Sequence, residues 1–121
     1  MTICSNILAT ATVVVTLGTS AVAQGFQVVT DETRFVQLVD GRQLTRLGIQ
    51  LNVSPNGGIQ GRAFGMKVTG SWTWQGNYFC REMSYGASSL PMNCQEVLLS
   101  GDTIRFVADQ GTGDSADLRL R

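Results

Sequence analysis

The chain contains no histidine, and this absence excludes several kinds of site at once. Without imidazole there is no Ser-His-Asp or Cys-His nucleophile and no zinc, copper or iron site with histidine ligands. Lysine is almost absent as well: Lys67 is the only one, and Ser71 would lie about 13 Å from it along a strand, too far for a Ser-Lys pair. The common routes to nucleophilic and metal-assisted catalysis are therefore missing.

Net charge is also absent. Nine basic residues balance nine acidic ones, and none of them occurs before residue 24. Because the charges are balanced and do not cluster, the sequence gives no electrostatic reason to bind phosphate. We expect no nucleic-acid partner and no attraction to an anionic membrane surface.

Residues 1–23 carry no charged side chain and resemble a secretory leader. An apolar run over residues 7–17 is followed by the small-x-small site Ala21-Val22-Ala23, so we expect residues 1–23 to be a signal peptide that is cleaved before Gln24. The first six residues lack the usual basic side chains, which leaves an upstream start codon or an uncleaved anchor as alternatives. The favoured reading places the mature protein in the periplasm or outside the cell, with no stable membrane anchor.

The remaining residues, 24–121, are enough for one small domain with a modest core. They contain two cysteines, Cys80 and Cys94. In an exported protein this pair is expected to form a disulfide, closing a loop of about 15 residues and contributing about 3 kcal/mol. A reactive thiol pair is the alternative, but the spacing is not C-x-x-C.

One short helix is expected near the start of this domain. After a strand-like segment at residues 26–29, residues 30–41 have helical spacing that places Phe35, Leu38 and Val39 on one face. Thr30 or Asp31 is a suitable N-cap, and a glycine at position 41 ends the helix.

Beyond residue 44 the pattern changes to the alternation of β-strands. The two-residue turn Gly76-Asn77 is a strong hairpin signal, and residues 86–93, which include Pro91, are expected to form an irregular loop. We predict a mainly β fold, an antiparallel meander forming a small barrel or curled sheet of about seven strands. The expected strands are residues 44–53, 59–64, 67–75, 78–85, 94–99, 103–109 and 116–121.

Aromatic residues supply the best candidate binding site. Trp72 and Trp74, two positions apart, share one face of a strand, and Tyr78 and Tyr85 are near. They could form a platform for a sugar or a small apolar ligand. The alternative is that this face belongs to the core of the barrel.

Carboxylates do not make a convincing hydrolase site. If Cys80 and Cys94 are opposite each other, Glu82 and Glu96 lie about 13 Å apart, which is too far for a glycosidase pair. They are more simply solvated strand charges.

Two further patterns also fail on context. Residues 111–116 match the formal dinucleotide pattern G-x-G-x-x-G/A, but an alternating strand follows them where a helix is required. The nearby Asp109, Asp114 and Asp117 do not have EF-hand spacing. We therefore expect no cofactor and no metal.

Several segments resemble a family of short exported bacterial proteins that often carry the name dihydrodipicolinate reductase. The resemblance rests on Gly61-Arg62-Ala63-Phe64-Gly65, Val68-Thr69-Gly70-Ser71-Trp72-Thr73-Trp74, Tyr78-Phe79-Cys80-Arg81 and Asn93-Cys94-Gln95. It implies a shared small fold. A genuine reductase of that name has an N-terminal Rossmann fingerprint and a His-His motif with a lysine; no position here matches them, so no catalytic residue is carried over.

A second similarity, in residues 70–74 and the Cys80/Cys94 pair, is to small periplasmic β-barrel inhibitors of secreted proteases. Those block their targets with a projecting N-terminal segment, a part that residues 24–30 would play here. We expect a non-enzymatic binding or inhibitor-like module, whose partner is a protein or a small apolar or sugar ligand. The alternative is an enzyme, either the reductase of the family name or a carboxylate-based hydrolase.

Overall fold

The computed structural model describes residues 10–14 and 25–121. The expected cleavage site between Ala23 and Gln24, and most of the expected signal peptide, lie outside the described residues. Cleavage therefore stays a prediction. Within the described part of the chain, no helix is long and apolar enough to cross a membrane.

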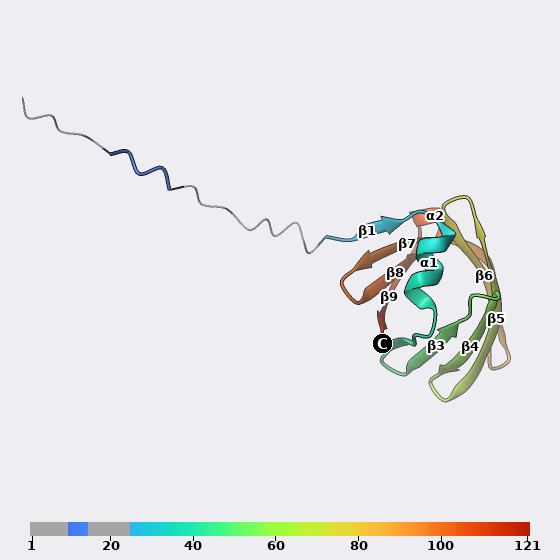
Figure 1. The fold of residues 1–121 in the computed structure, drawn as a ribbon. Coiled ribbons are helices and arrows are strands. Elements are labelled where there is room, and N and C mark those ends of the chain that lie inside the picture. The colour runs from blue at the N-terminus through green and yellow to red at the C-terminus, as the bar shows by residue number, and fades with distance from the viewer. Residues whose placement is uncertain (1–9, 15–24) are drawn as a thin grey trace, which may run out of the picture.

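The domain is a closed antiparallel barrel with one extra strand (Figure 1). Eight strands pair in the ring β7-β6-β5-β4-β3-β2-β9-β8, and β7 pairs again with β8 to close it. The short β1 lies outside this ring and adds to β7. The elements are β1 (Gln27–Val29), α1 (Glu32–Val39), β2 (Leu44–Arg46), β3 (Ile49–Val53), β4 (Gly58–Ala63), β5 (Met66–Gln75), β6 (Tyr78–Tyr85), β7 (Ser88–Ser100), β8 (Thr103–Val107), α2 (Ala108–Gly111) and β9 (Ser115–Leu120).

The predicted mainly β antiparallel architecture is confirmed, but the expected number of strands, about seven, is too low. Residues 44–53 are two strands, β2 and β3, joined at Leu47-Gly48, where Gly48 takes the left-handed φ of 77° that a tight turn requires. Residues 86–93, expected as a loop, instead contain the start of β7. Pro91 fits there because the β6–β7 register shifts between Arg81 and Met83, and proline is tolerated at such an irregularity.

Helix α1 forms where the sequence predicts it. The side chain of Asp31 caps its first turn by accepting a hydrogen bond from the Arg34 N–H at 2.7 Å. Its apolar face, Phe35, Leu38 and Val39, is buried. In Figure 1 the helix lies across the interior of the ring of strands, so it fills part of the barrel.

This helix divides the barrel into two ends. Phe35 packs against the rings of Trp72, Trp74 and Phe79, with centroids 4.9 to 5.3 Å apart. The indole N–H of Trp72 donates to the Ser54 carbonyl at 2.8 Å, which ties this cluster to the β3–β4 turn. We call this the plugged end. The open end is the opposite one, where the β2–β3, β4–β5 and β6–β7 turns and the β8–β9 connection lie.

The structure joins Cys80 and Cys94, whose sulfur atoms are 2.04 Å apart. The two residues are direct partners in the β6–β7 ladder, as the sequence reading assumed. Their neighbours Phe79, Arg81 and Gln95 face the barrel interior, so the disulfide lies on the outer face of the sheet. It links the two strands that form one wall of the interior.

Candidate binding cavity in the barrel

The half of the barrel beyond α1 is hollow. A cavity of about 320 Å³ lies there, and its apolar lining comes from strands all round the ring. Strand alternation explains this lining, because every second residue of a barrel strand points inward. The buried apolar residues of this lining are Leu44, Val53, Ile59, Phe79, Phe106 and Leu118.

Phe79 forms the boundary between the packed and the hollow halves. Its ring contacts Phe35 of the helix at 4.9 Å and Trp72 at 5.7 Å, and it contacts Phe106 at 5.3 Å. The same side chain lines the cavity. Phe79 and Phe106 therefore line the cavity, and Phe79 is backed by the packed aromatic cluster around Phe35.

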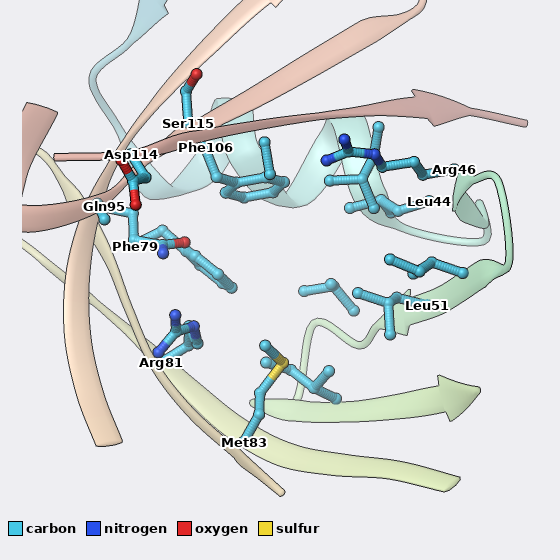
Figure 2. A pocket seen from close by; sticks show the side chains of 16 residues that line it. Leu44, Arg46, Leu51, Phe79, Arg81, Met83, Gln95, Phe106, Asp114 and Ser115 are labelled. Atoms are coloured by element: carbon cyan, nitrogen blue, oxygen red, sulfur yellow. The ribbon is translucent and has the colours of Figure 1, made fainter. Parts of the chain in front are cut away.

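Polar side chains enter this apolar space from two sides. Arg81 on β6 and Gln95 on β7 line one wall, and Arg46 on β2 lines the other (Figure 2). In the eight-membered ring β2 and β6 are four strands apart in either direction, so the two arginines approach from opposite walls. Asp114, which precedes β9, also lines the cavity.

Gln95 is the buried polar side chain of the described core, with 9% of its surface exposed. Its side-chain amide makes no hydrogen bond to any part of the chain that the structure describes, although it faces the cavity. In the described part of the chain no buried side-chain nitrogen or oxygen lacks a partner, so the Gln95 amide, which makes no hydrogen bond, keeps its polar atoms in contact with solvent in the cavity. Its donors and acceptor are thus available to whatever fills the hollow.

Arg81 is the second polar group on the same wall. Burial lowers the pKa of its guanidinium, because the charged form loses water. One of its nitrogens, Nη1, donates to the Pro91 carbonyl at 2.9 Å, and it forms no ion pair with a carboxylate of the described residues. Across residues 25–121 the one ion pair is Arg105 with Asp117, which does not line the cavity.

A second apolar hollow continues toward the open end. It has a volume of about 230 Å³ and shares Ile49, Leu51 and Met83 with the first. Phe64 and Leu90 line it and are 68% and 42% exposed, so its outer wall reaches solvent. The two hollows together give an apolar path from the barrel interior to the open end.

The predicted aromatic site is divided between the two ends. Trp72 and Trp74 are together, but within the cluster around Phe35, and the Trp74 indole donates to the Gly76 carbonyl at 2.8 Å. Tyr78 begins β6 beside the same hairpin, whereas Tyr85 ends β6 and lines the outer apolar hollow. A ligand-binding role for these four residues stays a prediction.

Sequence reasoning missed Arg81, Gln95 and Met83 as cavity residues. The signal was present in β6, where Phe79, Arg81, Met83 and Tyr85 alternate onto one face.

The carboxylates considered for catalysis are placed apart from this cavity. Glu82 accepts a hydrogen bond from the Ser71 hydroxyl at 3.3 Å, and Glu96 is paired in register with Val107. Residues 111–116 lead into strand β9, as predicted. In the described ranges, no group of three or more cysteine, aspartate or glutamate side chains is arranged to hold a metal ion.

Comparison with known proteins identifies no relative: no family model, no curated protein and no solved structure matches the chain. The cavity is therefore the feature of this protein that points to a function.

Proposed function

We propose that this protein is a non-enzymatic binding module that takes one small apolar molecule into its barrel, and that it works in the periplasm or outside the cell. The observation that carries the proposal is the hollow of about 320 Å³ on the far side of the Phe35–Phe79 contact. Its volume falls at the lower end of the range of about 300–1,000 Å³ found for ligand sites.

The contrast between the two ends of the barrel supports this choice. The plugged end is filled by aromatic rings in contact, whereas the open end leaves apolar walls unfilled. An unfilled apolar cavity costs stability because its lining side chains lose packing partners. A ligand of matching shape would recover that loss, which is a source of affinity.

The inhibitor-like alternative has less support. It needs residues 24–30 to project toward a target, but Gln27–Val29 pair with Val97, Leu98 and Leu99 of β7. Val29 is also buried. The alternative of a dihydrodipicolinate reductase has no support either. The cavity lining contains neither histidine nor lysine, the residues of that enzyme's catalytic motif.

A neutral fluorescent probe tests the proposal. N-phenyl-1-naphthylamine emits strongly only in apolar surroundings, and we expect saturable binding of one molecule to the purified domain. Ala116 lines the cavity, so Ala116→Phe should fill part of it and weaken binding at least tenfold. The control Thr69→Phe places the same ring at an exposed position outside this cavity and should leave binding unchanged. No saturable signal from the wild type, or equal binding by Ala116→Phe, would overturn the proposal.

A further inference from the structure

The wall formed by β6 and β7 carries the two polar groups that are hardest to explain by folding alone. Arg81 and Gln95 both face the cavity, and neither is paired with a side chain in the described structure. Gln95 is paired in register with Phe79, two residues before Arg81, so the two side chains are diagonal neighbours on one face. Such neighbours are about 7 Å apart, close enough to contact one small group together.

The hydrogen-bonding chemistry of Arg81 and Gln95 indicates which chemical group of a ligand they would bind. Guanidinium N–H groups donate and cannot accept, and the Gln95 amide adds two more donors. Arg81 uses one nitrogen on the Pro91 carbonyl, which leaves Nε and Nη2 free in the described structure. Planar guanidinium donors match the two oxygens of a carboxylate, and such charge-assisted bonds are the stronger kind.

The surroundings of Arg81 also favour a carboxylate as its partner. The Arg81 guanidinium has lost water and forms no ion pair with a carboxylate of residues 25–121, so it favours an anion that replaces its solvation. The cavity lining contains two basic residues, Arg81 and Arg46, and one acidic residue, Asp114. Its net charge is therefore positive. The rest of the lining near Arg81, including Phe79 and Met83, is apolar.

From this arrangement, and resting on the proposed function, we infer that the ligand is an amphipathic anion: an apolar body with one carboxylate. The carboxylate binds Arg81 and Gln95. The apolar body extends past Met83 into the second hollow and toward the open end between Phe64 and Leu90. A medium-chain fatty acid has this chemistry.

Decanoate and 1-decanol make a matched pair, since they differ mainly in the charged group. Each would be used to displace N-phenyl-1-naphthylamine from the wild-type domain. We expect decanoate to compete at a concentration about tenfold or more below that of decanol, the effect of one charge-assisted interaction. Equal competition by the two compounds would overturn the inference while leaving the proposed function intact.

Two arginine variants locate the charge that matters. Arg81→Met keeps most of the apolar stem and should abolish the advantage of decanoate, while binding of the neutral probe is retained, which shows that the barrel has folded. Arg62→Met is the matched control: Arg62 is exposed, does not line the cavity and hydrogen-bonds the Gly65 carbonyl. It should keep the advantage. An advantage that survives in Arg81→Met would overturn the assignment, whereas failure of the probe to bind the wild type would overturn the proposed function itself.

Discussion

The rings of Phe35 and Phe79 meet with their centroids 4.9 Å apart, and this contact separates a packed half of the barrel from a hollow one. Phe35 is fully buried and comes from α1, whereas Phe79 comes from the barrel wall. The helix therefore supports, through Phe35, a ring that lines the cavity.

Removing that side chain should be costly. Phe35→Ala is expected to lower the free energy of unfolding by about 3–5 kcal/mol, because it deletes a buried ring that contacts three other aromatic residues. Urea unfolding followed by tryptophan fluorescence measures the change. Phe64→Ala makes the same chemical deletion at a position 68% exposed and should cost less than about 1 kcal/mol. Equal losses in the two variants would contradict the packing described here.

The Cys80–Cys94 link should stabilise the cavity wall. Cys94→Ser is expected to lower the free energy of unfolding by about 2–4 kcal/mol, because the link restricts the unfolded chain over a sequence separation of 14. Chemical reduction of the wild type should produce a similar loss. Thiol titration of the unfolded, unreduced mature domain should find no free thiol; two free thiols would show that the link does not form.

The ion pair on the outer face predicts a small dependence of stability on acid pH. Arg105 donates to both carboxylate oxygens of Asp117, at 2.7 and 3.0 Å, and this hydrogen bonding lowers the pKa of Asp117 below its ordinary value of 3.8. A lowered pKa adds stability that is fully present above the pKa of the unfolded chain and is lost as pH falls below it.

Asp117→Asn should therefore destabilise the domain at pH 6 more than at pH 3, as measured by urea unfolding. The difference should be small because both partners are partly exposed to solvent, which screens their interaction. Asp102→Asn is the control, since Asp102 has no ion pair in residues 25–121. A penalty for Asp117→Asn that is the same at both pH values would contradict the assignment.

Export should remove residues 1–23. The apolar run ends in Ala21-Val22-Ala23, so the mass of the exported protein should correspond to a chain that starts at Gln24. A mature protein that still starts at Met1 would exclude cleavage.

Sequence patterns within a few residues were sufficient to predict the elements that form from local interactions, such as helix caps and tight turns. The N-cap at Asp31 and the spacing of Phe35, Leu38 and Val39 predicted α1, and the glycine-asparagine turn predicted the β5–β6 hairpin. The turn between β2 and β3 was missed because Leu47 continues an apparent strand, yet it is 93% exposed.

Features that depend on tertiary pairing were harder to predict. Pro91 argued against a strand, and only the shifted register of β6 on β7 makes room for it. The cavity could not be predicted from local patterns, because it depends on how far one helix fills a closed barrel. The tryptophans were recognised as one face of a strand, but the sequence did not reveal that Phe35 covers them.

The most direct test of the account is to locate a bound apolar molecule by NMR. With the domain saturated by N-phenyl-1-naphthylamine, nuclear Overhauser effects between the probe and the methyl groups of Met83, Ala116 and Leu118 should appear, because these residues line the hollow. Val28, about half exposed on β1 and absent from the cavity lining, should show none. Contacts from the probe to Val28 or other residues outside the cavity, without contacts to those three methyl groups, would contradict the claim that the barrel interior is the binding site.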